Sequence, residues 1–232
     1  VQTSPSYGTV YYDFNCSAEP VNNVLVRKAI CLAIDRQSII DNVVQVDAQP
    51  AYSFLAPGYS VDGKDITEGR ESFGLSATAD VEGAQAALAE AGYPNGEGYP
   101  TIEYSTNDSG YHVPLAEYLQ QTWGDLGITL TINKMEWSAF TAARRAGEYD
   151  VARNGWVMDY NDPSNMIELF CTGNGNNDGK YSNPDFDAAM EASKVADAAE
   201  HFAQLHKAED ILMEDMGSVS YTHLTLPTIL RV

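Results

Sequence analysis

The sequence has few basic residues and no long apolar stretch. Thirteen Lys and Arg stand against 33 Asp and Glu, which gives a formal net charge of -20 at pH 7. A field of that sign repels polyanions, so we expect no nucleic-acid partner. No run approaches the roughly 18 apolar residues of a membrane span, and residues 1–10 lack the basic and apolar regions of a signal peptide. The hydrophobic share of 44% is enough to bury a core.

Cysteine is scarce, and the motifs of common enzymes are missing. Cys16, Cys31 and Cys171 form no CxxC pair and lack a nearby His at metal spacing, so they predict neither a zinc site nor a disulfide framework. Cys31 lies in an apolar helical run and is expected to be a small core residue. The chain has no GxSxG, P-loop, HExxH or GxGxxG. We therefore expect no catalysis and no cofactor. The alternative, a carbohydrate-active or hydrolytic enzyme, is weak because no two carboxylates stand out as a pair.

Strand and helix signals alternate along the chain. We expect strands at residues 7–14, 101–105, 128–133 and 149–157. We expect helices at residues 80–91, 114–126, 136–146, 187–196 and 200–215, and two more that begin at Asn22 or Asn23 and at Asp35. About 30 residues after the second of these are rich in Pro and Gly and predict a long loop. This alternation indicates an α/β fold.

Four segments carry a resemblance to a known family. They are VLVRKAICLAIDRQSIIDNVV at residues 24–44, ALAEAGYPNGEGYP at 87–100, INKMEWSAF at 132–140 and YDVARNGWVMDYNDPSNMIELF at 149–170, with SNPDFD at 182–187 in addition. In this order they resemble the peptide-binding branch of the solute-binding proteins of ABC importers, bacterial extracellular solute-binding protein family 5. The resemblance implies one lobe of a class II, periplasmic-binding-protein-like fold, a mixed sheet flanked by helices. Two such lobes close on a ligand about a hinge.

The resemblance divides the chain into three parts. Residues 1–17 are expected to be a strand that crosses from a first lobe, and residues 18–217 to be the ligand-binding second lobe. The family pattern then calls for a return strand. Residues 219–228, VSYTHLTLPT, instead resemble the translation of a transposase-type sequencing-library adapter. We therefore expect residues 218–232 to be a non-native tail and the chain to be truncated at both ends.

The charged ends of a free peptide call for opposite charges in its receptor, because an unpaired buried charge costs several kcal/mol. Asp159 follows a predicted strand, where α/β proteins place ligand groups, and the resemblance assigns it to the ligand's amino terminus. The alternative is an N-cap on the next helix. Arg153 and His112 are candidates for the peptide carboxylate, as the resemblance also implies. Their alternatives are a partner for a neighbouring acid and a satisfied surface histidine.

Aromatic residues near these positions suggest the walls of the site. Trp137 and Trp156 are expected beside the ligand's side chains, because rigid flat rings give contact area at little entropic cost. Tyr160 and Asn161 are expected at the rim. Trp123, on an amphipathic helix, is expected in the core.

One segment matches the bare spacing of an EF-hand calcium loop. The matching positions are Asn174, Asn176, Asp178, Gly179 and Asp185. The first ligand would be Asn rather than Asp, and the twelfth a short Asp instead of Glu. We therefore expect no metal.

The resemblance implies an extracytoplasmic substrate-binding component of an ABC transporter, which captures short peptides and delivers them to a membrane permease. A binder of another solute, such as a dipeptide, a nickel complex or a sugar, is the alternative on the same fold. We expect a monomer in the periplasm or at the cell surface, lipid-anchored in its full-length form.

Overall fold

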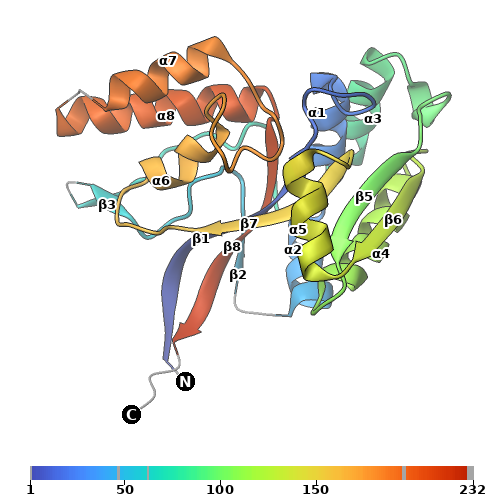
Figure 1. Cartoon of the computed structure of the whole chain (residues 1–232), viewed down its shortest axis with the longest axis horizontal. Coiled ribbons are helices and arrows are strands. Elements are labelled where there is room, and N and C mark those ends of the chain that lie inside the picture. The colour runs from blue at the N-terminus through green and yellow to red at the C-terminus, as the bar shows by residue number, and fades with distance from the viewer. Residues whose placement is uncertain (1, 46–47, 62, 195–196, 229–232) are drawn as a thin grey trace.

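A computed structural model describes residues 2–45, 48–61, 63–194 and 197–228 (Figure 1). Its strands are β1 (Gln2–Phe14), β2 (Ala48–Pro50), β3 (Ser60–Val61), β4 (Lys64–Asp65), β5 (Ile102–Asn107), β6 (Leu130–Met135), β7 (Val151–Val157) and β8 (Ser218–Thr228). Its α-helices are α1 (Val24–Leu32), α2 (Arg36–Ser38), α3 (Val81–Glu90), α4 (His112–Gly124), α5 (Trp137–Ala146), α6 (Ser164–Ile167), α7 (Pro184–Ser193) and α8 (Ala198–Glu214). Within these ranges no helix has the length and apolarity needed to cross a membrane.

The strands form a mixed sheet. In the described part of the chain its order is β2-β8-β1-β7-β5-β6, with β3 and β4 as a separate pair. β1 runs antiparallel to β7 and β8, whereas β5 runs parallel to β6 and β7. Helices pack on the sheet at both sides (Figure 1). The prediction of an α/β fold with a mixed sheet flanked by helices is confirmed.

Two helices cover opposite faces of the parallel strands. Leu119 and Trp123 of α4 belong to the main hydrophobic core together with Tyr104 of β5. Phe140 of α5 packs instead in a smaller cluster with Ala152 of β7. The expected core place of Trp123 is confirmed, since the side chain is fully buried.

Local capping signals explain where several helices begin. The side chains of Asn23, Asp35 and Asp80 accept hydrogen bonds from backbone N–H groups in the first turns of α1, α2 and α3. Gly92, with φ +98, follows α3 in the left-handed region. Cys31 is fully buried in α1, as expected. The sequence patterns therefore located these helices correctly.

The structure differs from the predictions in the less regular parts. The second half of the helix expected from Asp35 is a π-helix, Ile39–Val44. The expected long loop contains the short strands β2, β3 and β4, and the 3-10 turn at Pro94–Gly96 was not predicted. α6 and the 3-10 turn after it, Glu168–Phe170, were not predicted either. α7 begins earlier than expected because Asn183 caps it and Pro184 is tolerated in a first helical turn.

β7 is paired along the whole of one edge and along only part of the other. It pairs with β1 from Val151 to Val157, but with β5 only at Val151 and Ala152. The backbone N–H of Met158 donates to the carbonyl of Tyr7 in β1. Because successive residues of a strand face opposite neighbours, the N–H and C=O groups of residues 153, 155 and 157 face away from β1. β7 therefore lacks a partner among the described strands along residues 155 and 157, whereas the carbonyl of Arg153 accepts a hydrogen bond from Nη1 of Arg144 at 3.3 Å. We call this unpaired stretch the open edge of β7.

β8 occupies the place of the expected non-native tail. It pairs with both β1 and β2. Ser220, Tyr221 and Thr222 are buried, and their hydroxyl groups have no hydrogen-bond partner among the described residues. Such unpaired groups in an interior strand are unusual. Because any strand can pair here, the foreign origin of residues 218–232 stays a prediction, and residues 229–232 lie outside the described chain.

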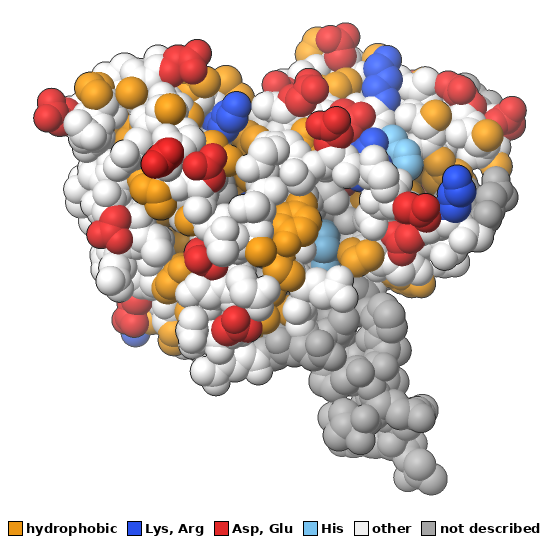
Figure 2. Space-filling model, turned by 180° about the vertical axis from the view of Figure 1, so that it is seen from behind, with side chains coloured by type: hydrophobic (Ala, Val, Ile, Leu, Met, Phe, Trp, Pro, Cys, Tyr) orange, Lys and Arg blue, Asp and Glu red, His pale blue; other side chains and the backbone are white. Residues whose placement is uncertain are grey.

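The surface is acidic, as the composition requires. Figure 2 shows Asp and Glu side chains spread over the back of the molecule, with only a few Lys and Arg side chains between them. The basic residues on this face form no continuous patch (Figure 2).

Candidate ligand-binding site

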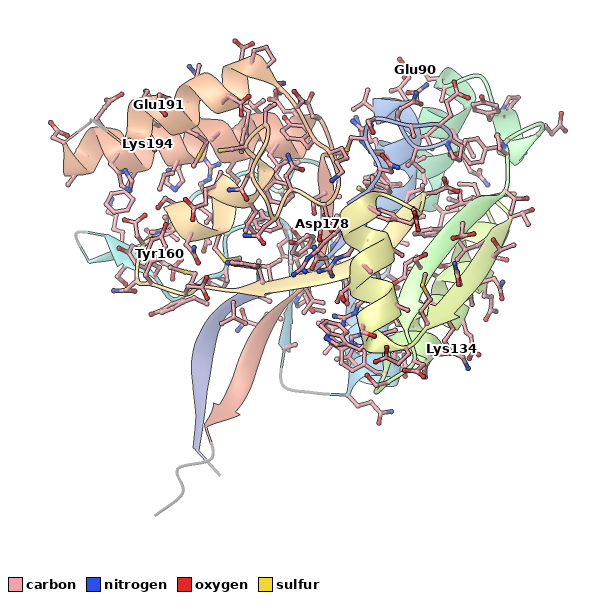
Figure 3. The ribbon with its side chains drawn as sticks, in the orientation of Figure 1. Glu90, Lys134, Tyr160, Asp178, Glu191 and Lys194 are labelled. Atoms are coloured by element: carbon pink, nitrogen blue, oxygen red, sulfur yellow. The ribbon has the colours of Figure 1, made fainter. Side chains whose placement is uncertain are left out.

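The predicted site residues form two groups along β7 and the loop that follows it. We call the group where β7 leaves β5 the arginine cluster, and its predicted members are Arg153, His112 and Trp137. We call residues 158–165, which follow β7, the aspartate loop; Asp159, Tyr160 and Asn161 belong to it, and Trp156 precedes it. Figure 3 shows Tyr160 at the end of β7 that lies away from α5. The structure therefore does not bring all the predicted residues into one cluster.

Arg153 lies directly after Ala152, where β7 and β5 separate; we call this point the fork between the two strands. Its Nε donates to Oδ1 of Asn107, at the carboxyl end of β5, at 2.6 Å. Its guanidinium carbon lies 5.0 Å from the ring centre of Trp137 and 5.4 Å from that of Phe140. Aromatic faces stabilise a cation at such distances. None of the ion pairs among the described residues includes Arg153, so the alternative of a partner for a neighbouring acid is wrong here.

His112 begins α4 close to the same arginine. Its ring lies 4.6 Å from that of Tyr111, and its Nδ1 is buried without a hydrogen-bond partner among the described residues. Burial, followed by the positive charge of Arg153, lowers the pKa of His112 to about 4. His112 is thus neutral near pH 7 and can act there as a hydrogen-bonding group but not as a cation.

The aspartate loop is organised by Asn165, a residue of α6. Its Oδ1 accepts from the indole N–H of Trp156 at 3.1 Å and from the backbone N–H of Asp159 at 2.8 Å. Its Nδ2 donates to Oε1 of Glu168 at 3.1 Å, and the hydroxyl of Tyr160 donates to the same oxygen at 3.0 Å. A single amide therefore orients both the Trp156 ring and the backbone of Asp159.

The carboxylate of Asp159 is exposed and makes no hydrogen bond within the described chain. The surrounding residues of this chain do not cover the side chain. The N-cap alternative is wrong, since α6 begins after Pro163 and has no side-chain cap. An uncovered carboxylate without an internal partner remains available to an external cation.

Large apolar side chains border the open edge of β7. Trp137 is 51% exposed, Tyr160 48% and Val157 44%. Asn161 is also exposed, and its backbone carbonyl accepts a bond from the Tyr59 hydroxyl. Each end of this edge therefore presents one exposed aromatic side chain, Trp137 at one end and Tyr160 at the other.

A cavity of about 760 Å³ adjoins the aspartate loop. Its lining includes Tyr160, Asp162, Glu168 and His201. His201, in α8, is partly buried here, with Nε2 3.2 Å from Oδ2 of Asp162. Pockets for small ligands have volumes of roughly 300–1,000 Å³, so this end of β7 has room for part of a ligand.

No metal centre appears in the described ranges. They hold no group of three or more His, Cys, Asp and Glu side chains that could bind an ion. In the segment with EF-hand spacing, Asp178 pairs with Nε of Arg144 at 2.8 Å, and Oδ1 of Asn174 accepts from the N–H of Asn176. These side chains are therefore committed to contacts within the protein.

Asn107 and Asn165 support the site and were not predicted. Asn107 ends β5, so the argument that singled out Asp159 at the end of a strand would also have found it. Asn165 lies within a short helix, and no sequence signal marks it. Its role follows only from the path of the chain.

A mixed α/β sheet with an open strand edge, a held cation at one end of that edge and an uncovered carboxylate at the other defines a lobe of the periplasmic-binding-protein type. The chain belongs to the bacterial extracellular solute-binding proteins, family 5, whose middle-region model matches residues 1–178.

Individual proteins with similar sequences or structures support this family membership. The chain is 35% identical over 221 residues to the periplasmic oligopeptide-binding protein OppA of Escherichia coli (strain K12), covering 94% of this chain and 40% of that protein. It resembles the crystal structure of a periplasmic oligopeptide-binding protein from Borrelia burgdorferi with a TM-score of 0.83 and 29% identity, over 96% of this chain and 44% of that one. Haemophilus influenzae OppA in complex with RPPGFSPFR gives a TM-score of 0.78 at 30% identity, with 96% and 44% covered. The chain thus spans 40% of the length of its curated E. coli relative.

Proposed function

We propose that this chain contributes one wall of a peptide-binding site in the extracytoplasmic component of an ABC importer, and that it binds without catalysis. Residues 18–217 form the ligand-binding lobe in this proposal, and residues 1–17 the strand that crosses from another lobe. The whole protein works as a monomer in the periplasm or at the cell surface, lipid-anchored, and passes its peptide to a membrane permease.

The open edge of β7 is the observation that carries the proposal. Residues 155 and 157 direct their backbone groups away from β1, and no described strand pairs with them. The carbonyl of Arg153, which faces the same way, already accepts a hydrogen bond from Arg144. An extended peptide can add to such an edge as a further strand, and its main-chain hydrogen bonds then supply affinity without regard to sequence. A Cβ added to Gly155 would meet nothing closer than 3.6 Å. The fold therefore does not require glycine here, and the missing side chain leaves space for a ligand.

The charged groups fit the two ends of such a peptide. In the proposal, Asp159 receives the ammonium group and Arg153 the carboxylate. His112 assists as a neutral hydrogen-bonding group. Trp137 and Trp156 flank the ligand's side chains, while Tyr160 and Asn161 lie at the rim. Opposite charges at the ends of an open strand edge favour a peptide over a sugar or a nickel complex, which have no strand-like backbone.

A titration of the ¹⁵N-labelled chain with tetra-alanine tests the proposal. We expect the backbone amide signals of Gly155, Val157 and Asp159 to shift in a saturable way. The matched control is the same peptide acetylated at its amino end and amidated at its carboxyl end, which should bind much more weakly. Equal binding of both peptides, or shifts elsewhere only, would contradict the proposal.

A further inference from the structure

Asp13 is a buried carboxylate outside the groups assigned to the ligand. It lies in β1, and only 2% of its surface is exposed. Its Oδ2 accepts a hydrogen bond from Nδ2 of Asn154, in the neighbouring strand β7, at 2.6 Å. The two side chains therefore contact each other across the central strands of the sheet.

Asn154 connects this carboxylate to the open edge. Its Oδ1 accepts from the backbone N–H of Gly155 at 2.9 Å. That N–H belongs to the set that faces away from β1, so it is one of the donors that an added strand would use. In this structure the N–H of Gly155 is already bonded to the side chain of Asn154.

The protonation state of Asp13 decides which orientations of the Asn154 amide are allowed: one when Asp13 is ionised, two when it is protonated. An ionised carboxylate can only accept, so it requires the NH₂ group of Asn154 and directs the amide oxygen to Gly155. A protonated carboxyl carries a donor, which can bond the amide oxygen after the amide has turned. The NH₂ group then faces the N–H of Gly155, donor against donor, and that N–H loses its internal acceptor.

We propose that Asp13 and Asn154 are positioning residues that control whether the ligand-facing N–H of Gly155 is available to a ligand. Asn154 occupies this N–H when Asp13 is ionised and releases it when Asp13 is protonated. This inference rests on the proposed peptide-binding function and adds a regulation of that same edge.

The surroundings of Asp13 place its ionisation in an accessible range. Burial raises the pKa of Asp13 from its ordinary 3.8 to about 7. Four groups that face Asp13 shift its pKa: Arg144 of α5, Asn154 of β7 and Lys180 lower it, and Asp178 raises it. Tyr149, before β7, faces it as well; burial and then the charge of Asp13 raise the pKa of Tyr149. Figure 3 shows Asp178 over β7, beside α5.

The first experiment needs no ligand. It follows the ¹⁵N and ¹H shifts of the Gly155 amide from pH 5.5 to 8.5. We expect one titration step near the pKa of Asp13 in the wild type, and its loss in Asp13→Asn. Asp125→Asn removes an exposed acid from the end of α4 and should leave the step unchanged. A wild-type amide without the step, or a step that persists in Asp13→Asn, would overturn the inference.

Asp13→Asn is expected to fold. A raised carboxyl pKa means that the native state holds the proton more tightly than the unfolded state, so the wild type loses stability as pH rises from 3.8 to about 7. The variant lacks this loss, and its thermal midpoint should equal or exceed that of the wild type at pH 7.5. Asn154→Ala serves as a second variant, in which Gly155 has no internal acceptor at any pH.

The second experiment measures tetra-alanine affinity at pH 6 and pH 7.5. Binding to the wild type should weaken by about two- to threefold between these pH values. A competing hydrogen bond of ~1 kcal/mol costs about fivefold at full ionisation, and Asp13 is only about three quarters ionised at pH 7.5. Asn154→Ala should bind at both pH values at least as tightly as the wild type does at pH 6. We compare the ratio of the affinities of the wild type and Asn154→Ala at the two pH values, because titration of the peptide itself affects both proteins equally. If the ratio of the two affinities does not change with pH, the inference is overturned. If no variant binds the peptide, the proposed function is refuted, and the titration of the Gly155 amide alone tests the role of Asp13 and Asn154.

Discussion

The two ends of β7 hold opposite charges in different ways. At the fork with β5, Arg153 is partly buried, bonded to Asn107 and stacked against Trp137. At the other end, only the backbone of Asp159 is held, by Asn165, and its carboxylate is in water. A guanidinium group can be partly buried because its faces pack on aromatic rings, whereas a carboxylate has no such contact and needs hydrogen-bond donors. The cationic end is thus preorganised, and the anionic end depends on a group from outside this chain.

The largest effect is expected from Arg153→Ala. Loss of a partly buried partner should weaken the binding of free tetra-alanine on the order of 100-fold, while the carboxy-amidated peptide loses little. The measurement is an NMR titration with both peptides. Arg145→Ala, an exposed arginine in the last turn of α5, is the matched control. An equal loss for both peptides would show that Arg153 acts on the fold rather than on the ligand carboxylate.

Asp159→Asn should have a smaller effect, because the carboxylate is exposed and unpaired in the free chain. We expect affinity for free tetra-alanine to fall by about tenfold, as for a charge-assisted hydrogen bond of ~1.5 kcal/mol. The amino-acetylated peptide should bind both proteins alike. If the mutation leaves the affinity for the free peptide unchanged, the assignment of the ligand's amino end is lost.

Asn165→Ala tests how far the aspartate loop depends on one amide. The bonds to Trp156, Asp159 and Glu168 disappear, and we expect a loss of about 1–2 kcal/mol in the free energy of unfolding, measured with denaturant. Peptide affinity should fall by less than with Asp159→Asn, because the carboxylate itself remains. Asn161→Ala, a change in the same loop at an exposed side chain, should leave stability unchanged. If Asn161→Ala lowers the free energy of unfolding as much as Asn165→Ala does, the loop does not depend on Asn165 alone.

His112 should give the smallest effect. Because its pKa is about 4, the imidazole stays neutral between pH 5.5 and 7.5, and its attraction for a carboxylate grows only as pH falls toward 4. The affinity ratio between the wild type and His112→Gln for tetra-alanine should therefore be the same at pH 5.5 and 7.5. A ratio that rises at pH 5.5 would mean that His112 binds as a cation.

Local patterns in the sequence predicted the elements better than their arrangement. Helix starts at Asn23 and Asp80 depend on neighbouring residues, so they could be identified from spacing alone. The fork after Ala152 could not, because strand order depends on contacts between distant residues. The same holds for the hydrogen bond between Arg153 and Asn107, which lie 46 residues apart.

The site was predicted residue by residue and not as an arrangement. The resemblance and the strand-end rule pointed to Asp159 and Arg153, and the structure places both along one edge. Whether they bind a peptide stays a prediction. The link from Asp13 through Asn154 to Gly155 carries no sequence signal, because it crosses between strands 141 positions apart.

The tail remains to be tested by a different observation. If residues 219–228 derive from a library adapter, the genomic DNA of the source should carry other codons after Gly217 or Ser218. We expect the native residues to leave fewer buried hydroxyls unpaired than Ser220, Tyr221 and Thr222 do. Identical codons in the genome would refute the foreign origin.

The fork between β7 and β5 also sets a length scale. From Arg153 to Asp159 the chain takes six steps, which at about 3.3 Å per residue is a span of ~20 Å. If Arg153 and Asp159 bind the two ends of a peptide as proposed, this span acts on the length of the peptide: a shorter one meets both charges only through the reach of the two side chains, and a longer one must bend away. Along this span, the ligand's side chains alternate in direction every residue. The proposed site would then select a peptide by the number of its residues and leave their identity largely free.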